Sequence, residues 1–179
     1  MSLTEAKMRI LEVLWKEDRP MKSNEVAQKL GFRTPATTLH LLGLKENGSV
    51  ATTKQGYYSI TDMGKEVMGL PRADRAQAAK ILSPLTAEKS FHFYTGLNKH
   101  LGIHANGLAD FCDKIQKIDV KSIEFHVPRH DFENWFKSLG DEELAKRMSV
   151  IRGMNLSGED LRKKIYETAK HRDQQLRSL

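Results

Sequence analysis

Residues Ser23–Leu70 carry the pattern that most restricts what this 179-residue chain can fold into. The pattern predicts a helix, a tight turn, a second helix, a hairpin and a third helix. The Ser23-Asn24 pair can cap the first helix, which ends at Gly31. Thr34-Pro35 favours the start of the second helix, and Asn47-Gly48 favours its end. The order of these signals therefore constrains the fold more than any single motif does.

Two strand-like segments follow the second helix. SVATT and YYSI alternate around the tip Lys54-Gln55-Gly56, which predicts a hairpin. Thr61-Asp62 then begins the third helix. Ahead of the pattern, residues 4–17 read as an amphipathic helix and Met21-Lys22 as a very short strand. Together these segments supply enough apolar surface for a small core.

In sequence terms, residues 4–70 resemble the winged helix-turn-helix modules of prokaryotic transcription regulators, including the MarR-like and ArsR-like families. The resemblance rests on Leu41 and Leu44, which lead into residues 47–50, and on the run from Gly56 to Gly64. It implies duplex DNA as the partner, with the second helix in the major groove and the hairpin beside the backbone.

The second helix departs from the usual DNA reader because it is rich in leucine. In the register that this resemblance implies, and at 100° per residue, Thr37, Leu41 and Leu44 point into the core. Leu39 then faces outward, with Leu42 at the margin of that face. Base edges are usually read by hydrogen-bonding side chains, which leucine cannot replace. The apolar face therefore predicts an interface with the second domain or with a second subunit.

Polar candidates for DNA contact surround this helix and the hairpin tip. We expect backbone contacts from Lys22, Arg33, Lys45 and Lys54, and limited polar contacts from Thr34, Thr38 and Gln55. The favoured hypothesis is a homodimeric DNA-binding regulator whose second domain dimerises or senses an unknown small-molecule effector. The alternative is a protein-interaction module that uses Leu39 and Leu42 without direct DNA binding.

The net charge of +6 permits binding to a polyanion but does not locate it. Residues 1–70 hold 10 Lys and Arg against 8 Asp and Glu, and the remainder holds 19 against 15. The excess is +2 in the first part and +4 in the second. Positive charge is therefore not concentrated on the expected DNA reader.

A boundary is expected near Pro71, followed by a linker or connecting helix over 71–89 and a helical domain over 90–179. The second half resembles a helical domain of unknown function that is associated with archaeal proteins. That resemblance covers roughly residues 90–173 and implies a helical fold without a known reaction. Its matching residues include Phe125-His126, Arg129, Asp131-Phe132, Trp135, Gly140-Asp141, Glu143-Leu144-Ala145 and residues 158–162. Five apolar residues are expected in its core: Phe125, Phe132, Trp135, Phe136 and Leu144.

Nothing in the sequence favours an enzyme, a metal or a cofactor. Asp131 and Asp141 sit where helix caps belong, and Cys112 lies in an apolar stripe. The histidines that invite a zinc hypothesis are His92, His100, His104, His126 and His130, but Gly102 and Pro128 interrupt the helical spacings. No apolar run approaches a membrane span, and the single cysteine gives no sign of disulfides. We therefore expect a cytoplasmic protein without membrane contact.

Overall fold

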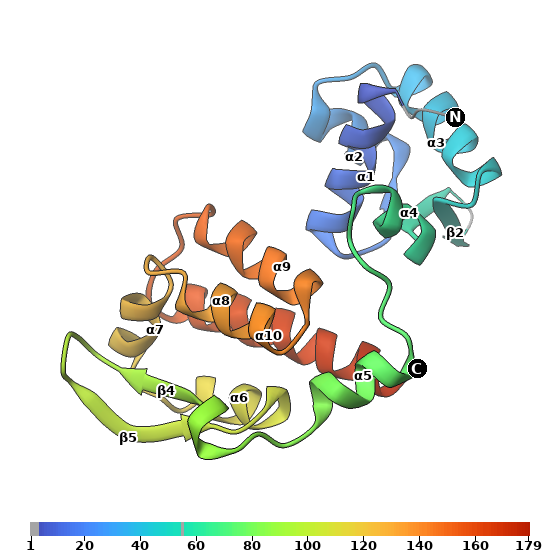
Figure 1. The fold of residues 1–179 in the computed structure, drawn as a ribbon. Coiled ribbons are helices and arrows are strands. Elements are labelled where there is room, and N and C mark those ends of the chain that lie inside the picture. The colour runs from blue at the N-terminus through green and yellow to red at the C-terminus, as the bar shows by residue number, and fades with distance from the viewer. Residues whose placement is uncertain (1–3, 55) are drawn as a thin grey trace. The chain divides into compact units, whose positions relative to one another are not determined.

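The computed structural model describes residues 4–54 and 56–179, and it divides the chain into two compact units, residues 1–72 and 73–179. Within the described residues the fold is mainly helical, with two small antiparallel sheets (Figure 1). Gln55, expected at the hairpin tip, lies outside the described residues. Among the helices that are described, none is both long enough and apolar enough to cross a bilayer.

The first unit contains four helices and three strands in its described part. They are α1 (Glu5–Glu17), β1 (Met21–Lys22), α2 (Ser23–Leu30), α3 (Thr34–Glu46), β2 (Val50–Lys54), β3 (Tyr57–Ile60) and α4 (Asp62–Val67). The strands form one antiparallel sheet in the order β1-β3-β2. The predicted elements of residues 4–67 are thus confirmed, including the very short strand at Met21-Lys22.

Apolar residues at helical spacing build the core of this unit. Its buried members are Ile10, Leu11, Leu14, Met21, Val26, Leu41, Leu44, Val50 and Tyr58. Thr37 is also fully buried, and its hydroxyl donates to the Arg33 carbonyl at 3.1 Å. The inward positions predicted for α3 are therefore confirmed.

The start of α2 differs from the predicted Ser23-Asn24 cap. The helix begins at Ser23, which places Lys22 at the capping position. The Lys22 backbone N–H donates to Glu25 Oε2 at 2.8 Å, while the Asn24 side chain accepts from the Glu25 N–H. A glutamate in the first turn thus satisfies the N–H that the cap leaves exposed. Gly31 ends the helix in the left-handed conformation, as expected.

The second unit joins a two-stranded hairpin to a set of helices. Its elements are α5 (Arg75–Leu82), the 3₁₀ turn η1 (Ala87–Lys89), β4 (Phe91–Tyr94), β5 (His100–Ala105), α6 (Leu108–Ile115), α7 (Val120–His126), α8 (Asp131–Ser138), α9 (Glu142–Arg152) and α10 (Gly158–Arg177). Within the segment 71–89, α5 packs into the core of this unit through Ala78 and Ile81. It lies beside the C-terminal end of α10, where Arg75 Nε donates to the Leu179 carbonyl (Figure 1).

The strand β5 was not predicted from the sequence. Its residues HLGIHA show no clean alternation, and Gly102 adopts a left-handed φ of 71°. The ladder between β4 and β5 also shifts register between His92 and Tyr94. An irregular strand of this kind lacks the period-two pattern on which strand prediction depends. The second unit is therefore mainly helical with one two-stranded hairpin, as far as the structure describes it.

Aromatic side chains dominate the core of the second unit. Phe93, Phe111 and Phe136 are fully buried, and the Phe111 and Phe136 rings meet edge to face at 5.0 Å. The predicted core positions Phe132, Trp135, Phe136 and Leu144 are confirmed. Phe125 is the exception, because it is half-buried and lies outside this core.

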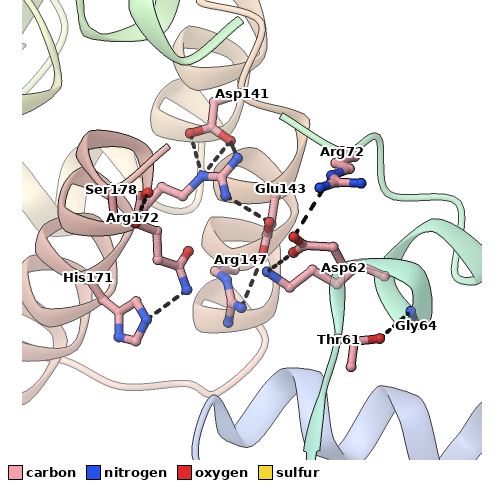
Figure 2. A network of polar contacts seen from close by, with 12 residues as sticks. Thr61, Asp62, Gly64, Arg72, Asp141, Glu143, Arg147, His171, Arg172 and Ser178 are labelled. Carbon is pink, nitrogen blue, oxygen red and sulfur yellow. Dashed lines mark hydrogen bonds and ion pairs between the residues drawn. The ribbon is translucent and has the colours of Figure 1, made fainter. Parts of the chain in front are cut away.

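A buried cluster of charges joins α9 to α10 (Figure 2). The Arg172 guanidinium donates to both oxygens of Asp141 at 2.9–3.1 Å and to Glu143 Oε2 at 2.9 Å. Arg147 donates to the other oxygen of Glu143 at 3.0 Å. Asp141 also caps α9 by accepting from the Leu144 N–H, so its predicted capping role is confirmed. Two carboxylates and two guanidinium groups thus offset one another out of water.

Candidate functional site

The sheet of the first unit brings two predicted cationic residues to one row. Lys22 on β1 and Lys54 on β2 are both register partners of Tyr57 on the central strand β3. Both lysines are exposed, and Lys22 Nζ lies 5.2 Å from the centre of the Tyr57 ring. Residues on alternate strands are separated by two inter-strand spacings, or roughly 10 Å. Residues more than 30 positions apart in the sequence therefore form one positive row across the sheet.

The remaining candidates lie along α3. Arg33 and Thr34 are exposed at its first turn, and Lys45 is exposed in its last turn. The N-terminal end of a helix carries partial positive charge, which adds to that of Arg33. The Thr38 hydroxyl donates to the Thr34 carbonyl at 3.0 Å, so its proton is already engaged within the helix.

The leucines of α3 stand out from this surface. The residue Leu39 is 70% exposed and Leu42 is 42% exposed. Gly43 lies beside Lys7 of α1, whose ammonium would be 3.1 Å from a Cβ at this position. The outer face of α3 within its own unit is thus apolar at its centre and cationic around its margins.

A hydrogen-bonded junction fixes the exit of the hairpin against the end of α3. The Thr61 hydroxyl donates to the Gly48 carbonyl at 2.6 Å. It accepts from the Gly64 N–H at 3.1 Å (Figure 2). The Thr61 N–H donates to the Ser49 carbonyl at 3.1 Å. One threonine therefore caps α4 and also holds the turn between α3 and β2.

Three of the histidines considered for zinc gather on the hairpin of the second unit. His92 on β4 lies opposite His104 on β5, and its Nδ1 is 3.3 Å from His100 Nε2. His92 Nε2 is 3.1 Å from the Ala87 carbonyl, while the Gly102 N–H donates to His100 Nδ1 at 3.0 Å. One assignment of tautomers satisfies all three contacts: His100 Nε2–H donates to His92, and His92 Nε2–H donates to Ala87. Each nitrogen of the two rings then has one hydrogen-bond partner.

His126 joins β4 to the start of α8. Its Nε2 accepts from the Tyr94 N–H at 2.9 Å, and its Nδ1 is 2.7 Å from Asp131 Oδ2. Asp131 also accepts from Arg129 Nε at 3.2 Å. The predicted capping role of Asp131 is wrong, because His130 occupies the capping position and Asp131 is the first helical residue. The carboxylate instead fixes the ring of His126 and the guanidinium of Arg129.

Burial lowers the pKa of His126 below its ordinary value near 6.5, although its hydrogen bond to Asp131 acts in the opposite direction. The unfolded chain therefore takes up this proton at a higher pH than the folded chain. We expect the free energy of unfolding to fall as the pH drops below about 6.5, and to keep the full contribution of His126 above that value. Urea unfolding from about pH 8 to about pH 5 tests this. His126→Gln should show a shallower pH dependence than the unchanged protein; an equally steep one would contradict the assignment.

Cys112 is the one cysteine of the chain, and it is buried in α6. Burial raises the pKa of its thiol to about 12, and the nearby Asp173 acts in the same direction. The thiol therefore stays protonated near neutral pH, which leaves it a poor nucleophile. The structure thus favours a packing role for this side chain.

The described residues contain no group of three or more His, Cys, Asp or Glu placed to hold a metal ion.

The sequence matches a family of unknown function (DUF5752) over residues 57–170. The chain belongs to this family. The matched range begins at β3, so it leaves α1, α2 and α3 outside and includes most of the second unit. Comparisons with curated proteins and with solved structures found no match.

Proposed function

We propose that the first unit is a winged helix-turn-helix module, similar to those of MarR-like and ArsR-like regulators, and that it binds duplex DNA. The order of α1, β1, α2, α3 and the β2–β3 hairpin supports this proposal. The short turn at Gly31 between α2 and α3, and the strand order β1-β3-β2, also support it. In this arrangement α3 is the recognition helix and the hairpin is the wing.

The row of Lys22 and Lys54 on either side of Tyr57 carries the proposal furthest. Two ammonium groups in one row across the sheet suit the phosphates of a DNA backbone. Arg33 at the start of α3 adds a guanidinium, and the helix terminus adds its own partial charge. The apolar Leu39 allows contact with a thymine methyl but no hydrogen bond to a base. We therefore expect DNA binding with modest sequence specificity and strong salt dependence.

Fluorescence anisotropy of the full chain with a labelled, mixed-sequence duplex tests the proposal. We expect a dissociation constant of about 10⁻⁶ to 10⁻⁴ M, weakening steeply with salt because phosphate contacts release counterions. The double variant Lys22→Gln/Lys54→Gln should bind more weakly and reduce the steepness of the log–log salt plot by about 2. Lys80→Gln, an exposed lysine of the second unit, is the matched control and should leave both quantities unchanged. No detectable binding at low salt would overturn the proposal.

The exposure of Leu39 and Leu42 favours a second candidate, a module that binds a protein partner or a second copy of the chain. The double variant Leu39→Gln/Leu42→Gln separates the two functions in the same assay. Retained DNA affinity together with a shift from dimer to monomer in sedimentation would assign these leucines to self-association. Loss of DNA affinity without a change in mass would instead place them in the DNA contact.

A further inference from the structure

A pocket of about 380 Å³ in the second unit is not used by the proposed DNA contact. It is lined by residues of the β4–β5 hairpin, α7 and the start of α8. Its apolar walls include Phe91, Tyr94, Leu97 and Phe125. Volumes of this order hold small organic ligands, and apolar walls with a few fixed polar groups are typical of such sites.

Leu97 is the first feature that favours ligand binding in this pocket. It lies in the turn between β4 and β5, and it is 75% exposed although it lines the pocket. The turn is closed by a hydrogen bond from the Thr95 N–H to the Lys99 carbonyl at 3.0 Å. The apolar body of a ligand would remove Leu97 from water, which is favourable for a leucine side chain.

Arg129 is the second such feature, because the protein holds its guanidinium in place. Nε donates to Asp131 Oδ2, and the guanidinium carbon lies 4.9 Å from the centre of the Phe125 ring. Within the described part of the chain, the hydrogen bonds assigned to this group involve only Nε. The terminal nitrogens are therefore available to a ligand, and a guanidinium edge matches a carboxylate with two parallel hydrogen bonds. Because the group is already fixed, less conformational freedom is lost on binding.

The charge of the pocket favours a singly charged ligand over a doubly charged one. Arg129 carries the positive charge among the lining residues, and Asp131 opposes it. His126 adds none near neutral pH, because both ring nitrogens serve a neutral imidazole. A doubly charged phosphate would meet the Asp131 carboxylate with only one cation to offset it. A monocarboxylate adds half that charge, and its two oxygens match the two terminal nitrogens of Arg129.

We infer that this pocket binds a small monocarboxylate with an aryl body, held by Arg129 at its charged end and by Leu97, Tyr94 and Phe125 along its ring. All the residues that line the pocket fall within the range matched by the family. They also all lie in the second unit, so the site is independent of DNA binding by the first unit.

Titration of the full chain with phenylacetate tests this inference, with binding measured by calorimetry and by backbone amide NMR. We expect binding with a dissociation constant of about 1 mM, given the efficiency typical of a ligand of this size. The largest amide shifts should fall on the hairpin turn and on α7. Phenylacetamide, which has the same ring without the charge, should bind at least about tenfold more weakly.

Arg129→Gln should weaken phenylacetate binding by about tenfold or more, because it removes the charge-assisted pair. Arg75→Gln is the matched control on α5, outside the pocket, and should bind like the unchanged protein. Any of three results would overturn the inference. They are no binding at a phenylacetate concentration about ten times the expected dissociation constant, equal affinity for phenylacetamide and phenylacetate, and backbone NMR shifts confined to other surfaces. Binding that survives Arg129→Gln unchanged would do the same.

Discussion

Arg172→Met is expected to destabilise the second unit by about 3–5 kcal/mol, because it leaves Asp141 and Glu143 buried without their main cation. The side chain of Asp141 is fully buried and that of Glu143 is 4% exposed. Neither carboxylate can recover hydration in the folded state. Methionine has a similar length and is apolar, so the loss comes from the charge rather than from a cavity. Urea unfolding followed by Trp135 fluorescence in a Trp15→Phe background measures the change.

Lys163→Met is the control on the same helix. Lys163 pairs with Glu167 at 3.9 Å, and both side chains are more than half exposed. An exposed pair of this kind contributes about 0–1 kcal/mol, so the control should unfold at nearly the same urea concentration as the unchanged protein. Equal effects of the two substitutions would mean that the cluster around Arg172 is hydrated and contributes little.

Local signals predicted most of the first unit. Gly31, Pro35 and Thr61 act within a few residues of their own positions, and each begins or ends an element near where the sequence indicates. The inward positions of α3 follow from helical periodicity together with the register that the family resemblance implies. The alignment of Lys22 and Lys54 on one row could not be read in this way, because it depends on the register of two strand pairs.

Three features of the second unit could not be predicted from the sequence. Asp131 is a residue type that often caps helices, yet His130, with a left-handed backbone conformation, occupies the capping position. The Asp131 carboxylate therefore contacts His126 and Arg129 instead. The partners Asp141 and Arg172 are 31 residues apart, and their meeting depends on how α9 packs against α10. The pocket likewise needs the unpredicted strand β5, because its hairpin turn forms one wall. Contacts between distant segments decide the last two features, and periodicity contains no information about them.

Gly64→Ala is expected to destabilise the first unit by about 3 kcal/mol, at the upper end of the range for overpacked cores. A Cβ at this position would collide with the Ser49 carbonyl oxygen and lie 2.8 Å from Ile60 Cγ1. The Ser49 carbonyl also accepts from the Thr61 N–H, so it cannot move without breaking the junction that holds the hairpin. Urea unfolding followed by Trp15 fluorescence in a Trp135→Phe background measures the loss.

Gly43→Ala provides the matched control, a glycine-to-alanine change in a helix of the same unit. The nearest atom to its added Cβ is Lys7 Nζ at 3.1 Å, the far end of a flexible side chain that can move aside. Alanine is favoured over glycine inside a helix by about 0.5–1 kcal/mol, so this variant should be as stable as the unchanged protein or slightly more so. Opposite outcomes for the two variants would show that close backbone approach, rather than helix propensity, requires glycine at position 64. If Gly64→Ala were as stable as Gly43→Ala, the packing of α4 against the Ser49 turn would have to be looser than the structure shows.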